Sequence, residues 1–367
     1  MNNVNNTDSM YIHIPFCKNI CSYCDFTKIF YSIAYEEKYL EALFKEIKDD
    51  NPNKCKTIYI GGGTPSVLTT TGLEKLLSFV NKYLREDYIE FTVEVNPETI
   101  DEEKVKLFKK YNVNRVSIGV QSFNKDILTL LGREHDYEDV KKCVDLLNEH
   151  NIENYSFDFM YGINGLTISH IKKDMKNILK LNPKHISYYS LILEDHTCLK
   201  VKQYQEMDEE KVVKQYEYIK KNLKKNGFSQ YEVSNYSKTG YQSSHNLVYW
   251  NGEEYYGYGL GASGYVNGVR YINTKNLTKY MKFDLDRQKE EVTQGDLKTE
   301  FVMLGLRLVD GVSLSKYKCL FNSDILVDKK EEIASLKKRR LIKIIDDKLV
   351  ATNKGMLLLN QVILELI

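Results

Sequence analysis

The chain has 367 residues and a formal net charge of +1, from 52 basic and 51 acidic side chains. This balance provides no global electrostatic field that would attract nucleic acid or an anionic membrane. No apolar run approaches the roughly 20 residues of a membrane-spanning helix, and the first ten residues lack the basic and apolar regions of a signal peptide. We therefore expect a cytoplasmic protein with reduced thiols, no nucleic-acid partner and no membrane span.

Three cysteines, Cys17, Cys21 and Cys24, lie within eight residues and directly follow the strand-like run YIHIPF. Their odd number argues against a disulfide framework, and no second cluster supplies the fourth ligand of a structural zinc site. Three thiolates without a fourth fit a 4Fe–4S cluster that leaves one iron open to a small molecule. The remaining cysteines are isolated and are interpreted as structural, namely Cys55, Cys143, Cys198 and Cys319.

Strand-like runs alternate with helical patterns over the first half of the chain, beginning with MYIHIPF, TIYIGGG, YIEFTVEVNP, NRVSIGVQSF, YSFDFMYG and HISYYSLIL. We interpret these runs as apolar and continuous, which is typical of strands covered on both faces. Among the intervening helical patterns is TGLEKLLSFVNKYL, in which Thr71 and Glu74 have the spacing of a capping box. Six strands alternating with helices predict parallel βα units, arranged as an open doubly wound sheet or an incomplete barrel.

Five of these runs end in a polar or glycine-rich motif: CKNICSYC, GGGTP, EVNP, GVQSF and FDFMYG. Because chemistry in parallel α/β folds gathers at the carboxyl ends of strands, we expect the five motifs to share one site. The glycines of GGGTP let the backbone approach a ligand, and its polar groups could hold the ammonium and carboxylate of an amino acid. The GGGTP run itself matches neither G-x-G-x-x-G nor a G-K-[ST] ending, so it is not read as a Rossmann fingerprint or a P-loop.

Four further side chains at the strand ends are candidates for ligand binding. Glu94 offers a carboxylate to ribose hydroxyls or an ammonium group, and Asp158 has the same capacity. Arg133 suits a carboxylate because its guanidinium binds in a bidentate manner, and Gln121 ends the neighbouring strand. Each residue alone is more often a surface or ion-pair residue, but around one cavity we expect all four to bind a ligand.

Beyond about residue 195 the pattern changes, and an amphipathic helix precedes the aromatic stretch HNLVYWNGEEYYGYGLGASGYVNGVRYIN. We interpret this stretch as strands and turns that extend the sheet beside the barrel. Farther on, helices followed by a hairpin resemble a winged helix. The basic run Lys337 to Arg340 is interpreted as a solvated helix face, because the overall charge is balanced. We expect three domains, at 1–195, 196–290 and 291–367.

The CxxxCxxC spacing after a short hydrophobic strand resembles the signature of the radical S-adenosylmethionine (SAM) superfamily, and GGGTP resembles its SAM-methionine motif. In that superfamily SAM chelates the open iron, and an electron from the cluster cleaves its sulfonium to give a 5′-deoxyadenosyl radical. The resemblance favours an α/β fold, the incomplete (β/α)6 barrel, with a smaller C-terminal α+β (winged-helix-like) domain.

A narrower resemblance is to the HemN/HemW branch, which comprises oxygen-independent coproporphyrinogen III oxidases and heme chaperones. It is carried by YIHIPFCKNICSYCDF, YIGGGTPSVL, EVNPETI, NRVSIGVQSFNKDILTLLGREH, FDFMYGING, HNLVYW and VMLGLRLVDGVSL. The resemblance implies a cluster held by Cys17, Cys21 and Cys24. It implies a SAM on the cluster that is bound by Tyr11, Gly62 and Glu94. It also implies a second SAM site lined by Tyr23, Gly63, Thr64, Gln121, Arg133 and Asp158.

Two departures from the oxidases point towards the chaperones of the branch. The oxidases carry a further cysteine two residues after the third, where this chain has Asp25-Phe26. The oxidases also use a longer N-terminal segment near their substrate, whereas ten residues precede Tyr11 here. His13 lies two residues after Tyr11, so strand alternation places both on one face, and we leave His13 as an unassigned cavity residue.

The stretch from His245 to Trp250 resembles the HNxxYW motif of the chaperones, which is associated with heme binding. A neutral imidazole can be an axial iron ligand, and Tyr249 and Trp250 offer flat apolar surface to a macrocycle. Without the resemblance, a hydrogen-bonded core histidine beside packed aromatic rings is the better explanation of these residues.

The resemblance therefore implies a heme chaperone with a 4Fe–4S cluster, SAM and heme as bound cargo. Its expected partners are recipient hemoproteins and an electron donor such as flavodoxin or ferredoxin. The alternative is a SAM-dependent oxidase that decarboxylates coproporphyrinogen III to protoporphyrinogen IX. Radical chemistry on another substrate and a zinc-stabilised module are further alternatives, and no catalytic residue is predicted.

Overall fold

The computed structural model describes residues 7–367; the first six residues of the N-terminal segment lie outside the described part. A nine-stranded sheet has the order β11-β1-β4-β5-β6-β7-β8-β10-β9. Its six central strands run parallel. They are β1 (Ser9–Ile14), β4 (Thr57–Gly62), β5 (Glu90–Val95), β6 (Arg115–Gln121), β7 (Tyr155–Tyr161) and β8 (His185–Ser190).

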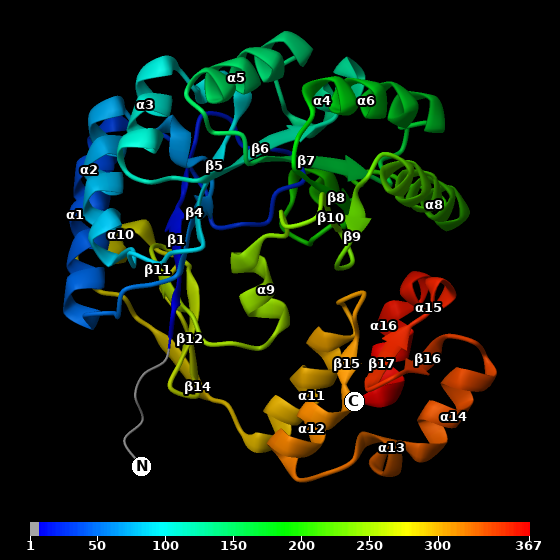
Figure 1. Cartoon of the computed structure of the whole chain (residues 1–367). Helices are drawn as coiled ribbons and strands as arrows, with labels where there is room; N and C mark the ends of the chain where they lie inside the picture. The colour runs from blue at the N-terminus through cyan, green and yellow to red at the C-terminus, as the bar shows by residue number, and fades with distance from the viewer. Residues whose placement is uncertain (1–6) are drawn as a thin grey trace.

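Helices cover the outside of the curved sheet, as the arc of ribbons in Figure 1 shows. They are α1 (Ile33–Asp50), α2 (Thr70–Val80), α3 (Glu102–Lys110), α4 (Lys125–Leu131), α5 (Tyr137–Glu149), α6 (Ile168–Leu181) and α8 (Glu209–Lys225). The short α7 (Cys198–Val201) precedes α8. This arrangement confirms the expected incomplete (β/α)6 barrel.

Side chains of the parallel strands alternate between an apolar outer face and a polar inner face. On β6, Val116, Ile118 and Val120 belong to the hydrophobic core, while Arg115 and Ser117 line an internal cavity. The interpretation of these runs as continuously apolar was therefore wrong. The inside of the barrel holds a polar cavity, so only one face of each strand packs against an apolar layer.

The segment after residue 195 extends the sheet at both edges, as expected. The antiparallel strands β9 (Ser229–Gln230) and β10 (Asn235–Ser237) add to β8, and β11 (Tyr256–Tyr258) pairs in parallel with β1. Three further strands form a separate antiparallel sheet, namely β12 (Ser263–Val266), β13 (Val269–Ile272) and β14 (Gln288–Glu291). The helix α10 (Leu277–Met281) lies between the last two.

The HNLVYW motif forms a helix, α9 (Ser244–Trp250), where strands and turns were expected. Ser243 caps this helix by accepting a hydrogen bond from the Asn246 amide. The Ser243 hydroxyl and the Ser244 amide both donate to Glu90, at 3.0 and 2.7 Å. The cap and this distant carboxylate together outweigh the strand preference of the aromatic residues.

The start of α2 also differs from the expected capping box. Thr69 is the N-cap and accepts from the Gly72 amide at 2.9 Å. Its own amide donates to Glu36 of α1 at 3.0 Å. Glu74 instead forms an ion pair with Lys110 at 2.7 Å. The helix therefore begins before Thr71, because a contact with α1 fixes its first turn.

The C-terminal part has its own hydrophobic core, formed by residues from Val302 to Leu366. Its antiparallel sheet contains β15 (Val312–Ser313), β16 (Ile342–Ile345) and β17 (Lys348–Ala351). Its helices are α11 (Gln294–Gly305), α12 (Leu314–Phe321), α13 (Ile325–Asp328), α14 (Lys330–Lys338), α15 (Asn353–Leu357) and α16 (Leu359–Leu366). This confirms the smaller α+β domain. Within residues 7–367 every helix is too short or too polar to cross a membrane.

Candidate functional site

A cavity of about 440 Å³ lies inside the barrel. All five strand-end motifs contribute to its wall, so the expected convergence is present in the fold. Two of the candidate residues, Tyr11 and His245, are not part of the lining. Those that line it are Cys17, Cys21, Tyr23, Cys24, Gly62, Gly63, Thr64, Glu94, Gln121, Arg133 and Asp158.

Cys17 ends β2 (Phe16–Cys17), and Cys21 and Cys24 lie on the loop that leads to β3 (Ile29–Phe30), which pairs in parallel with β2. All three are free thiols. Burial raises the pKa of Cys17 to about 12 and also raises the pKa of Cys24. Among residues 7–367 no three Cys, His, Asp or Glu side chains could hold one metal ion. The three thiols border one shared cavity, and a trio of thiolates fits a 4Fe–4S cluster that leaves one iron open.

Each glycine of GGGTP makes room for a different side chain of the site. A Cβ on Gly61 would come within 2.8 Å of Glu94, and one on Gly63 within 2.8 Å of the Cys17 sulfur. Gly62 has φ +114°, and a Cβ there would lie 2.5 Å from the His13 ring. The glycines therefore allow the cysteine loop, β1 and β5 to meet at one point.

Glu94 is held in place by two donors. The Tyr59 hydroxyl donates to Oε1 at 2.7 Å, and the Gly62 amide donates to Oε2 at 3.0 Å. Burial raises the pKa of Glu94 to about 7, and these two hydrogen bonds oppose that rise. The carboxylate is thus positioned beside GGGTP and titrates near neutral pH.

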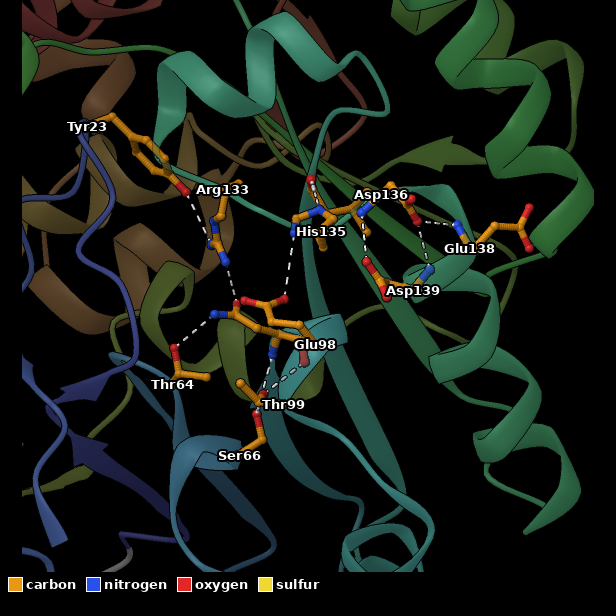
Figure 2. Close-up of polar contacts among 12 residues, drawn as sticks. Tyr23, Thr64, Ser66, Glu98, Thr99, Arg133, His135, Asp136, Glu138 and Asp139 are labelled. Carbon is orange, nitrogen blue, oxygen red and sulfur yellow. Dashed lines mark hydrogen bonds and ion pairs between the residues drawn. The ribbon is translucent and has the colours of Figure 1, made fainter.

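Arg133 connects candidate residues from three different motifs, as Figure 2 shows. Its Nη1 donates to Asn96 at 2.6 Å, and its Nη2 donates to the Tyr23 hydroxyl at 3.4 Å. Asn96 in turn donates to Thr64 Oγ1 at 3.1 Å. The buried Nε of Arg133 has no hydrogen-bond partner among the described residues. Asn96 was missed in the sequence, although it belongs to the EVNP motif.

Gln121 is the last residue of β6, and Asp158 lies in the middle of the adjacent strand β7. Gln121 has φ +64°, and the pairing of the two strands shifts register between Gly119 and Gln121. A left-handed backbone conformation is unusual for residues other than glycine, and such backbone strain is typical of functional sites. Asp158 accepts from Ser117 at 3.1 Å, and burial raises its pKa.

Tyr11 and His13 share one face of β1, as expected, but His13 lies beneath Gly62 and outside the cavity lining. Its Nε2 lies 2.7 Å from the Thr27 carbonyl, so that nitrogen donates. Its Nδ1 then accepts from the Tyr11 hydroxyl at 2.9 Å. Burial lowers the pKa of His13 to about 4. This neutral histidine links β1 to the cysteine loop.

His245 is fully buried on α9, and both of its ring nitrogens have partners. Nδ1 lies 2.9 Å from Thr57 Oγ1, and Nε2 lies 2.8 Å from the Tyr249 hydroxyl. The ring stacks on Tyr59 with centroids 5.3 Å apart, and burial lowers its pKa to about 3. The next residue, Asn246, does line the cavity. The HNxxYW motif therefore lies against the amino ends of β4 and β5.

Sequence reasoning missed the inward side chains that precede the strand-end motifs. They occupy every second position, so a reading of strand alternation would have found them. They include Tyr59, Arg115, Ser117 and Ser187.

Two family profiles match this chain: the radical SAM superfamily over residues 11–178 and the HemN C-terminal domain over residues 292–358. "Heme chaperone HemW" of Lactococcus lactis is 39% identical over 363 residues, which cover 97% of this chain and 96% of the relative. The protein of the same name from Bacillus subtilis is 36% identical over 374 residues, covering 96% and 97%.

Among solved structures, the coproporphyrinogen III oxidase HemN of Escherichia coli matches with a TM-score of 0.86. The match covers 98% of this chain and 89% of that chain at 21% identity, and it shows the fold alone. Radical SAM proteins carry a 4Fe–4S cluster and bind SAM, so both cofactors are implied here. With relatives this similar along almost its whole length, the chain belongs to the HemW family of the radical SAM superfamily.

Proposed function

We propose that this protein is a heme chaperone, which binds heme and transfers it to recipient hemoproteins. The observation that carries the proposal is the near full-length similarity to relatives named heme chaperone HemW. Asp25-Phe26 in place of the additional cysteine of the oxidases supports the same conclusion. We propose that residues 1–195 bind the cluster and SAM, and that residues 196–290 contain the HNxxYW motif associated with heme binding.

In this proposal Cys17, Cys21 and Cys24 would hold the cluster, which, once reduced by an electron donor, would supply the electron that cleaves SAM. Glu94 accepts hydrogen bonds from that SAM, and the Gly62 backbone lies beside the same carboxylate. The second SAM site would be lined by Tyr23, Gly63, Thr64, Gln121, Arg133 and Asp158, with Asn96 bonded to both Arg133 and Thr64. An electron donor such as flavodoxin or ferredoxin and a cytoplasmic location complete the proposal.

Heme ligation by His245 requires the ring to give up one of its two hydrogen bonds. The bond to Thr57 joins α9 to β4, whereas the bond to Tyr249 lies within α9. We propose that the Tyr249 bond is exchanged, because its loss leaves α9 attached to the sheet. Nε2 would then be the iron ligand.

Two assays on one anaerobic, cluster-reconstituted sample test the proposal. Hemin titration should produce a Soret band, which His245→Ala should weaken and Tyr249→Phe should preserve. Incubation with coproporphyrinogen III, SAM and a reductant should yield no protoporphyrinogen IX. Absence of hemin binding would refute the chaperone, and turnover of coproporphyrinogen would favour the oxidase.

A further inference from the structure

Arg115 lies at the deep end of the cavity, where β6 begins, and only 2% of its surface is exposed. Its Nε has no hydrogen-bond partner among the described residues. No carboxylate within residues 7–367 forms an ion pair with this guanidinium, and Glu90 and Asp158 act on it only at longer range. A buried arginine in this situation is strongly unfavourable, because an arginine does not lose its charge.

The two nearby carboxylates are occupied by other donors. Glu90 accepts from the Thr92 hydroxyl at 2.9 Å, in addition to the two donors that begin α9. Asp158 accepts from Ser117. Neither carboxylate is arranged as the direct counter-ion of Arg115.

Within residues 7–367, the buried Lys104 and the partly buried Arg287 both have direct partners. Lys104 donates to the carbonyls of Ser66 and Thr99, at 2.7 and 2.9 Å. Arg287 forms ion pairs with Glu46 and Asp50, both at 2.8 Å. Arg115 differs from these cations because its guanidinium faces a cavity in place of a protein acceptor.

We propose that Arg115 anchors the carboxylate of a ligand that enters the barrel from the cysteine side. A guanidinium binds a carboxylate through two parallel hydrogen bonds. Ser117, Ser187 and Asn246 line the same cavity and offer further polar groups. This subsite lies at the opposite end of the strands from Arg133.

Two ligands supply such a carboxylate: the methionine moiety of a SAM-type ligand and the propionate of a porphyrin. The porphyrin source rests on the proposed heme-binding function, whereas the methionine source does not. Either carboxylate would bind the Arg115 guanidinium in the same way, so the experiment tests each kind of ligand in a separate arm.

The experiment measures binding to the cluster-reconstituted full-length protein by calorimetry and absorbance. One arm compares L-methionine with L-methioninamide, and the other compares hemin with hemin dimethyl ester. We expect the acid to bind roughly tenfold or more tightly than its neutral counterpart in at least one arm. In Arg115→Met this ratio should fall close to one, while Arg115→Lys should retain part of it.

Arg85→Met is the matched control, because Arg85 is a partly exposed arginine that pairs with Asp87 outside the cavity. It should leave both ratios unchanged. A ratio near one in both arms of the natural protein, or a ratio that survives in Arg115→Met, would overturn the proposal. Failure of hemin to bind at all would count against the chaperone function, and the methionine arm would then decide on Arg115.

Thermal unfolding of the ligand-free protein gives a second readout that a structural role would move in the opposite direction. Removing a buried charge without a partner should leave the Tm of Arg115→Met equal to or above that of the natural protein. A Tm lower by several degrees, together with an unchanged acid preference, would make Arg115 the counter-charge of Glu90 and overturn the proposal.

Discussion

The two ends of the barrel use polar side chains in different ways. At the mouth, the three thiols, the Glu94 carboxylate and the Arg133 guanidinium all border the cavity. At the floor, formed by the amino ends of the strands and α9, His245 and Glu90 direct their polar atoms to protein partners. The mouth gathers groups that face the cavity, whereas His245 and Glu90 at the floor hold α9, and Arg115 is the floor residue that faces the cavity instead. The HNxxYW motif therefore stabilises the fold, in addition to any role in ligand binding.

The largest effect that would test this contrast comes from removing a thiol at the mouth. Cys17→Ala should lower the iron content of the reconstituted protein from about four atoms per chain to near zero, because two thiolates do not hold a 4Fe–4S cluster. Iron and sulfide analysis measures this change. Cys55→Ala is the control, because Cys55 is equally a buried thiol but lies outside the cavity. Iron retained in Cys17→Ala would show that the mouth does not hold the cluster.

At the floor, His245→Ala should lower the free energy of unfolding of the ligand-free protein by about 3 kcal/mol. The substitution leaves a cavity beside Tyr59 and removes the partners of Thr57 and Tyr249. Urea denaturation measures the loss. A change below about 1 kcal/mol would contradict a structural task for this residue.

Glu94 makes ligand binding at the mouth dependent on pH. Its pKa of about 7 is raised above the ordinary value of 4.5, so the protonated form dominates below neutral pH. Because the ionised carboxylate is the better acceptor, the affinity for SAM should fall roughly tenfold between pH 8 and pH 6. Calorimetry at several pH values measures this slope, and Glu94→Gln should remove it. An affinity that rises towards acid pH would contradict the assignment.

The smallest effect separates the two hydrogen bonds of His245. Tyr249→Phe removes the hydroxyl and keeps the ring, so it should cost about 1 kcal/mol of unfolding free energy. The same urea titration compares it with His245→Ala. If both variants lose the same amount, the bond to Thr57 and the stacking on Tyr59 add nothing measurable, which would contradict the attachment of α9 to β4 through His245.

The sequence was sufficient to predict the mouth but not the floor. Cys17, Gly62 and Gln121 belong to motifs that end parallel strands, and such ends meet at one edge of a sheet. Arg115 belongs to no such motif, and its inward direction follows only from the alternation along β6. That alternation was hidden because the neighbouring Val116 and Ile118 made the run look apolar throughout.

The helical state of α9 depends on a contact that no short window of sequence contains. Val248, Tyr249 and Trp250 all favour strands. The helix forms because Ser243 and Ser244 meet Glu90, a residue more than a hundred positions earlier in the chain. The same reason explains the start of α2, which a carboxylate of α1 determines.

The alternation along the parallel strands also bears on how this fold changes in evolution. Its rigidity comes from valine, isoleucine and phenylalanine side chains that pack outwards beneath the helices. Inward substitutions between polar residues of similar size remove little of that packing. The residues that line the cavity can thus be exchanged with little loss of stability. The same barrel can therefore acquire new ligand specificities and remain folded.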